Sequence, residues 1–303
     1  RDTPMIILDC ETYANYFLVS MLDTTTNKTI DFELYDNHPI DSKKLAAILR
    51  QHTTIGFNSL NYDLPVIVAA LRGDTNAQIK QLSDDIINAP KVWPVLKKHK
   101  INIPQGFDHI DIMPIPIGQA SLKIYGGRLH APKMQELPIE PSALITPEQR
   151  NTLRLYCHND LQVTAILYNE LRPQIALREQ MGEQYGLDLR SKSDAQIAES
   201  VIKHELEAKD IDCTRPKVKI GTIYKYTKPK HITFKSQLFN DLVAMIERTD
   251  FVVNDNGQVA LPDELLTKIS FDGAEYQLGI GGIHSCESSQ AVIAQDDECL
   301  FDI

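Results

Sequence analysis

The stretch Met5-Ile6-Ile7-Leu8-Asp9-Cys10-Glu11 decides the fold of this chain. Its apolar, β-prone residues predict a buried strand over Met5–Asp9 that ends in acids. Asp9 and Glu11 stand two positions apart, so strand alternation would place both carboxylates on one face, roughly 6–7 Å apart at the backbone. Two such acids repel each other unless a cation lies between them. The pair fits a site for Mg²⁺ or Mn²⁺ and a solvated strand end equally well.

Strand-like and helix-like segments alternate after this stretch. Strands are expected over Tyr16–Leu22, Thr29–Leu34, Thr53–Phe57 and Phe107–Met113, the first two forming a hairpin. Helices are expected from Asp41 or Ser42, over Leu64–Leu71, Asn76–Asn88 and Lys91–His99, and from Thr146 to about Tyr185 with a break near Pro173. Residues 114–145 are rich in Pro and Gly and are expected to lack regular structure. This order predicts an α/β fold, a sheet with helices packed on it.

The character of the sequence changes after Gly186. We therefore expect one domain over residues 1–186 and a smaller α+β segment over residues 187–303. That segment contains expected helices over Ser193–Lys209 and Ser236–Arg248 and a final strand over Cys299–Ile303.

Composition sets limits on the class of protein. The chain has 303 residues, 43% of them hydrophobic and 24% charged, which is typical of a soluble globular protein. No apolar run is long enough to cross a bilayer, and the first residues do not resemble a signal peptide. The five cysteines are scattered, no two at zinc-ligand spacing, and are interpreted as small buried thiols in a reducing cytoplasm.

The net charge of −10 argues against a nucleic-acid partner, unless clustered acids bind metal and reverse the local field. Basic residues form two groups. The first contains Lys123, Arg128, His130 and Lys133, and the second contains Arg215, Lys217, Lys219, Lys225, Lys228, Lys230, His231 and Lys235. A charge-rich stretch is more often a solvated face, but aromatic residues interleave the second group, which moves the interpretation toward a surface that binds single strands.

Two further acids have both an ordinary and a catalytic interpretation. Asp63 directly precedes an apolar helix, where a plain N-cap would be its usual role. Tyr156 and Asp160 are four residues apart in a predicted helix, so they share one face. In isolation they fit a core Tyr beside a surface Asp, but Tyr is also able to orient a water while Asp holds a metal.

The ordered set formed by these motifs resembles the DEDD exonucleases of the RNase H-like fold. Asp9 and Glu11 match that family's first motif, Asn58 and Asp63 its second, with Tyr62 in the aromatic place. Tyr156 and Asp160 match the third motif of the subclass that carries Tyr. The other subclass has His five residues before the last Asp, where this chain has Leu155, so His158 is interpreted as a surface bystander.

The resemblance implies a mixed sheet flanked by helices and a metal-dependent 3′→5′ exonuclease that removes nucleoside monophosphates from DNA. Asp9, Glu11, Asp63 and Asp160 would hold two Mg²⁺ or Mn²⁺ ions, and Tyr156 would position the attacking water. The residues expected to contact a single-stranded 3′ end are Asn58, Tyr62, Lys123, Arg128, Lys133, Gly281 and Gly282.

Two other stretches, Ser121–Gln135 and Gly279–Ser285, resemble segments of bacteriophage family B DNA polymerases. The second resembles the glycine motif that joins exonuclease to palm, although Gly279 stands where that motif usually has Tyr. The resemblance implies the proofreading part of a larger polymerase, acting in the cytoplasm of an infected bacterium beside the palm, fingers and thumb of the same parent chain. No polymerase activity is expected from these residues themselves.

Two alternatives remain open at this point. The chain would be a free-standing 3′→5′ DNA or RNA exonuclease if no polymerase motifs followed it. It would be a binding scaffold if an exonuclease fold had lost its activity, although all the carboxylates that the motifs require are present.

Overall fold

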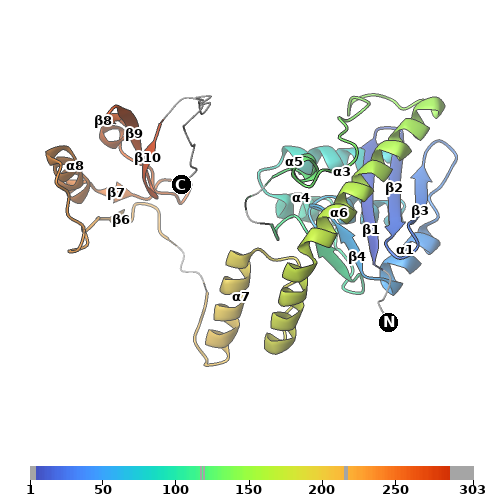
Figure 1. Ribbon diagram of the computed structural model, residues 1–303, viewed down its shortest axis with the longest axis horizontal. Helices are drawn as coiled ribbons and strands as arrows, with labels where there is room; N and C mark the ends of the chain where they lie inside the picture. The colour runs from blue at the N-terminus through green and yellow to red at the C-terminus, as the bar shows by residue number, and fades with distance from the viewer. Residues whose placement is uncertain (1–4, 117, 119, 215–217, 287–303) are drawn as a thin grey trace, which may run out of the picture. The chain divides into compact units, whose positions relative to one another are not determined.

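The structure is a computed structural model that describes residues 5–116, 118, 120–214 and 218–286. It divides into two compact units, Arg1–Cys213 and Thr214–Ile303. Figure 1 shows the elements of each unit. No helix among the described residues is long and apolar enough to cross a membrane.

A five-stranded mixed sheet forms the centre of the first unit. Its strands are β1 (Ile6–Tyr13), β2 (Tyr16–Asp23), β3 (Lys28–Leu34), β4 (Thr54–Gly56) and β5 (His109–Asp111). They lie in the order β3-β2-β1-β4-β5, with β1, β2 and β3 antiparallel and β1, β4 and β5 parallel. The sequence prediction of an α/β architecture is thereby confirmed.

Helices cover both faces of this sheet. The helices of the unit are α1 (Ser42–Gln51), α2 (Asp63–Arg72), α3 (Asn76–Asn88), α4 (Val92–Lys98), α5 (Leu122–Arg128), α6 (Pro147–Tyr185) and α7 (Asp194–Glu207). Leu8 and Cys10 of β1 face a core shared with α1 to α4. Ile7, on the opposite face, belongs to a second core with α5 and α6, and Figure 1 shows α6 crossing this face. The alternating side chains of β1 therefore divide the unit into two apolar layers.

The second unit is smaller and has few buried residues. It contains β6 (Ile223–Tyr224), α8 (Gln237–Arg248), β7 (Phe251–Val252), a 3₁₀ turn over Asp263–Leu265, β8 (Ile269–Phe271), β9 (Ala274–Gly279) and β10 (Gly282–Ser285). The last three strands form an antiparallel sheet in the order β10-β9-β8. The strand expected over Cys299–Ile303 lies outside the described residues.

Three expectations about elements were wrong. The helix expected to break near Pro173 runs without interruption as α6, because Leu171 and Ile175 on either side of the proline are buried in the second core. Residues 114–145 contain α5, which Ser121 caps by accepting a bond from the amide of Ile124. Strand β1 continues past Asp9 to Tyr13, because each residue through Tyr13 pairs with β2.

The boundary between the units lies at Cys213, whereas the sequence placed it at residue 186. Helix α7 belongs to the first unit because the C-terminal half of α6 contacts the N-terminus of α7. Arg178, only 3% exposed, donates to the carbonyl of Lys192 and forms an ion pair with Asp194 at 2.6 Å.

Candidate active site

Asp9 and Glu11 lie on the α6 face of β1, as the alternation predicted. Both side chains are half-buried, while Cys10 between them is buried in the opposite core. One carboxylate oxygen of each acid lies within 4.8 Å of the other and of the Cys157 sulfur. A solvated strand end would leave these acids exposed, so that alternative does not describe them.

Asp63 reaches the region of Asp9 and Glu11 because β1 and β4 stop pairing before Asp9, which leaves room for the start of α2. These strands pair only through Ile6 and Ile7, and the chain after β4 turns into α2. Tyr62 occupies the N-cap position, without a side-chain bond, so Asp63 is the first helical residue and not a plain cap. Its side chain is 4% exposed. This burial raises the pKa of Asp63 well above its ordinary value, and the charge of Asp9 adds to the rise.

Helix α6 supplies Asp160 and Tyr156. The sequence placed both side chains on one helix face, and a side-chain hydrogen bond joins them. The charge of Asp160 raises the pKa of both Asp9 and Glu11. The structure therefore brings together four carboxylates that span residues 9–160 of the sequence.

Burial, and after it the repulsion between neighbouring acids, raises the pKa values of this group. Burial, followed by the charge of Asp160, raises the pKa of Asp9 to about 7. Burial raises the pKa of Glu11 well above its ordinary value, and the charges of Asp9, Asp160 and Asp63 add to the shift. A divalent cation would offset this repulsion, and hard oxygen ligands are the ones that Mg²⁺ and Mn²⁺ prefer. The donor set thus fits the metals that the sequence predicted.

Two buried cysteines contact the carboxylates, although the sequence analysis did not single them out as site residues. Cys157 Sγ donates to Asp9 Oδ2 at 3.2 Å, and the Cys10 side chain bonds to Asp63. Burial raises the pKa of both thiols well above the ordinary value, and the neighbouring carboxylates raise it further. Both cysteines are therefore uncharged hydrogen-bonding groups here. Their position one residue from a site residue, Cys10 after Asp9 and Cys157 after Tyr156, was the only available hint.

Asp111, also not identified from the sequence, shapes the loop before Asp63. It is 2% exposed and accepts backbone N–H bonds from Asn58 at 2.9 Å, Leu60 at 3.1 Å and Met113 at 3.0 Å. Asn58 has a positive φ of 58°, which Asn tolerates better than most residues. The buried carboxylate thus holds the loop in the turn that starts α2.

A cavity of about 340 Å³ adjoins Asp160, and two predicted DNA-contacting residues line it. Lys123 and Lys133 lie there with Met134 and Asn159. Lys123 forms an ion pair with Glu136 at 2.5 Å. Burial raises the pKa of Asp160, and the charge of Lys123 opposes that rise. The cavity joins a carboxylate to basic groups, an arrangement suited to a phosphate chain.

None of the other predicted DNA contacts is among the residues that line this cavity. The Tyr62 hydroxyl is engaged with Ser83 Oγ at 2.8 Å, while its ring packs against the first core. Arg128 is exposed at the end of α5. Gly281 and Gly282 belong to the second unit, at the β9–β10 turn beside an apolar cavity of about 530 Å³.

The second basic group lies in the second unit. Lys225 pairs with Asp250 at 3.1 Å, and Tyr224 and Tyr226 are exposed beside it, while Arg215 and Lys217 lie outside the described residues.

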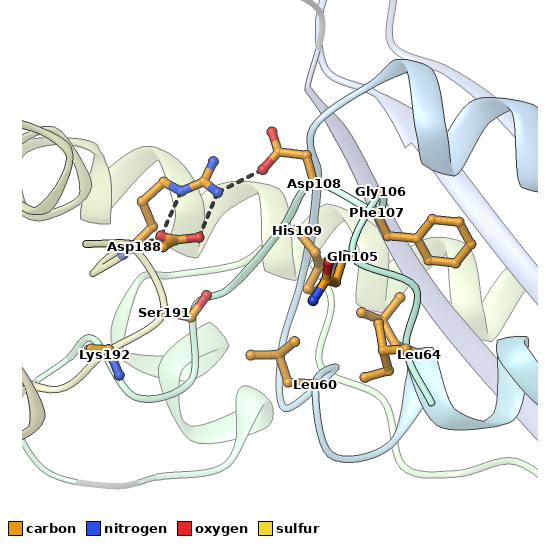
Figure 2. Close-up of a pocket in the computed structure, with 12 residues that line it drawn as sticks. Leu60, Leu64, Gln105, Gly106, Phe107, Asp108, His109, Asp188, Ser191 and Lys192 are labelled. Carbon is orange, nitrogen blue, oxygen red and sulfur yellow. Dashed lines mark hydrogen bonds and ion pairs between the residues drawn. The ribbon is translucent and has the colours of Figure 1, made fainter. Parts of the chain in front are cut away.

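A separate cavity of about 480 Å³ lies beside the start of α2 (Figure 2). Leu60 and Leu64 form one side, and Asp108 and Asp188, both ion-paired with Arg190, form another. None of its described lining residues is one of the four carboxylates.

His109 of this cavity is buried between two hydroxyls. Its ring nitrogens lie 2.7 Å from Thr54 Oγ1 and 2.6 Å from Ser59 Oγ. Burial lowers the pKa of His109 to about 4, so it is neutral at pH 7. Its bonds link β4 and β5 to the loop before α2, which is a structural role.

Comparisons with protein-family models, curated proteins and solved structures found no match to this chain.

Proposed function

We propose that this chain is a metal-dependent 3′→5′ exodeoxyribonuclease with an RNase H-like fold. The observation that carries the proposal is the meeting of Asp9, Glu11, Asp63 and Asp160 beside Tyr156. A mixed sheet with helices on both faces, the architecture that the family resemblance implies, also supports it.

Each protein group would have a distinct part in the reaction. The four carboxylates would hold two Mg²⁺ or Mn²⁺ ions, which supply an activated water and stabilise charge on the phosphate. Tyr156, already bonded to Asp160, would orient the water as a hydrogen-bond partner. Burial and neighbouring acids raise the pKa of the Tyr156 hydroxyl, so it remains protonated and able to donate.

Substrate contacts follow from the surroundings of Asp160. The cavity lined by Lys123 and Lys133 would take the phosphates of a single-stranded 3′ end. Asn58, held by Asp111, would contact the terminal nucleotides. The product would be a nucleoside monophosphate.

We further propose that the chain is the proofreading part of a bacteriophage family B DNA polymerase. This proposal rests on the sequence resemblances of Ser121–Gln135 and Gly279–Ser285. A downstream reading frame without polymerase motifs would instead favour a free-standing exonuclease.

The direct test is incubation with 5′-labelled single-stranded DNA and Mg²⁺. We expect a ladder shortened from the 3′ end, no reaction in EDTA, and loss of hydrolysis in Asp9→Ala and Asp160→Ala. Both variants should still bind DNA in Ca²⁺. Glu170→Ala, which removes an exposed acid elsewhere on α6, is the matched control and should retain full activity.

Tyr156→Phe should be milder than either Asp change, because the metal ligands remain. Wild-type protein that leaves the DNA intact would favour the inactive scaffold. Substantial activity in Asp160→Ala would refute the assignment of the site.

A further inference from the structure

A row of polar residues crosses the sheet beneath α6. The strand register pairs Asp9 of β1 with Ser20 of β2, and Ser20 with Asp31 of β3. Ser20 is completely buried and donates to Asp31 Oδ1 at 2.7 Å. Directly paired residues point to the same face, so all three side chains face α6.

Consecutive residues of α6 contact the two ends of this row. Cys157 Sγ donates to Asp9 Oδ2 at 3.2 Å, and His158 Nε2 lies 2.8 Å from Asp31 Oδ1. The Ser20 hydroxyl also forms a side-chain contact with the Cys157 sulfur. The polar chain thus runs from His158 through Asp31, Ser20 and Cys157 to Asp9, and His158 is part of it and not a bystander.

We propose that Cys157 is a positioning residue that fixes the Asp9 carboxylate for metal binding. The inference rests on the metal site of the proposed function. Cys157 is completely buried, so no water competes for its bond to Asp9. The same carboxylate accepts a second bond from the backbone amide of Cys10. Two donors from two different elements, β1 and α6, set the orientation of the carboxylate.

The remaining members of the row hold the donor in place. His158 and Ser20 both bond to Asp31, which ties the Cys157 turn of α6 to β2 and β3. The thiol therefore cannot move away from Asp9 without breaking contacts on neighbouring strands. Groups that orient a metal-binding carboxylate in this way contribute to metal affinity without touching the ion.

The test is equilibrium Mn²⁺ binding, measured by the EPR signal of free Mn²⁺, on wild type, Cys157→Ala and Cys157→Ser. Loss of an orienting partner typically weakens metal affinity 10–100-fold, and since a thiol is a weak donor we expect about tenfold for Cys157→Ala. Cys157→Ser retains a donor and should bind Mn²⁺ within about threefold of wild type.

Two controls separate positioning from loss of packing. Leu167→Ala removes a buried side chain from the same helix, away from the row, and should lower stability while leaving Mn²⁺ affinity unchanged. Cys213→Ala removes a half-buried thiol outside the row and should change neither.

Each outcome decides the inference. Unchanged Mn²⁺ affinity in Cys157→Ala, or an equal loss in Leu167→Ala, would overturn it, as would a wild type that binds no Mn²⁺. A wild type whose Mn²⁺ binding depends on Cys157 but that shortens no DNA would overturn the proposed function and leave the inference standing.

Discussion

At the level of a single side chain, Asp9 would couple the binding of a proton to the proposed binding of a metal ion. Its pKa in the folded protein is raised to about 7, against 3.8 for the free side chain. At pH values between 3.8 and about 7, the Asp9 carboxyl therefore holds a proton in the folded state that it has released in the unfolded state. Metal-free protein should therefore lose stability as the pH rises from about 4 to about 7, by about 1.4 kcal/mol for each unit of pKa difference.

Mn²⁺ should reverse this dependence, because at the proposed site it would bind the deprotonated carboxylates. Below pH 7 we expect the apparent Mn²⁺ affinity to rise about tenfold per pH unit for each proton displaced. Thermal melts at pH 5, 6, 7 and 8, with and without Mn²⁺, measure both effects. If the stability of the metal-free protein rose over this pH range, the raised pKa of Asp9 would be contradicted. The Asp9→Asn variant should show a weaker dependence of stability on pH than the wild type.

Asp111 makes a second prediction at the residue scale. Its carboxylate is the acceptor for three backbone amides, those of Asn58, Leu60 and Met113. Asp111→Ala leaves these amides without their partner, so we expect a loss of about 2–4 kcal/mol of unfolding free energy.

Urea denaturation measures this loss. Asp111→Asn, which retains an acceptor oxygen, should be milder. Nuclease activity should fall more in the Ala variant than in the Asn variant, since the loop leads directly into Asp63. Equal stability of Asp111→Ala and wild type would refute the role of Asp111.

At the scale of elements, α6 unites the site with the core. Over residues Pro147–Tyr185 it carries Tyr156, Cys157 and Asp160, and its later turns supply Leu161, Leu167, Leu171 and Ile175 to the second core. This packing holds the helix on the sheet. Several buried side chains share the task, so we expect the loss of one of them to lower stability without moving Asp160 away from β1.

Pro173 interrupts the hydrogen bonding of this helix. The residue is exposed, and it lacks the N–H that would bond to the preceding turn. Proline inside a helix costs about 3 kcal/mol, so Pro173→Ala should raise the unfolding free energy by about 1–3 kcal/mol.

Urea denaturation measures the expected gain in unfolding free energy. Gln174 is exposed beside Pro173, so Gln174→Ala is the control for a gain that comes from helix propensity alone. A less stable Pro173→Ala variant would mean that the restriction proline places on the unfolded chain outweighs the missing hydrogen bond.

At the scale of the whole molecule, the four carboxylates and both apolar cores lie within Arg1–Cys213. The second unit has two hydrophobic side chains that are buried among its described residues, Val253 and Leu265. The first unit should therefore fold without the second and retain the proposed metal site.

A chain ending at Cys213 tests this expectation. It should unfold cooperatively, gain thermal stability in millimolar Mn²⁺ and shorten single-stranded DNA. Circular dichroism and the nuclease assay measure these properties, with Asp160→Ala in the same short chain as the control. A short chain that aggregates or shows no cooperative transition would show that the second unit is needed for folding.

The sequence by itself determined the elements whose signals are local. The alternation in β1, the hairpin of β2 and β3, and the bounds of α3 follow from periodicity and caps within a few residues. Strand and helix periods likewise predicted that Asp9 would share a face with Glu11 and Tyr156 with Asp160, whereas Asp63 was chosen from the resemblance to an ordered family pattern.

Only the tertiary structure decided what depends on distant partners. Cys157, Ser20 and Asp111 carry no local signal, because each acts through contacts between elements far apart in the chain. Packing likewise kept α6 continuous through Pro173, since buried neighbours on both sides outweigh one missing hydrogen bond. The physical reason is that periodicity is a property of neighbouring residues, whereas burial, charge repulsion and orientation arise only once separate elements meet.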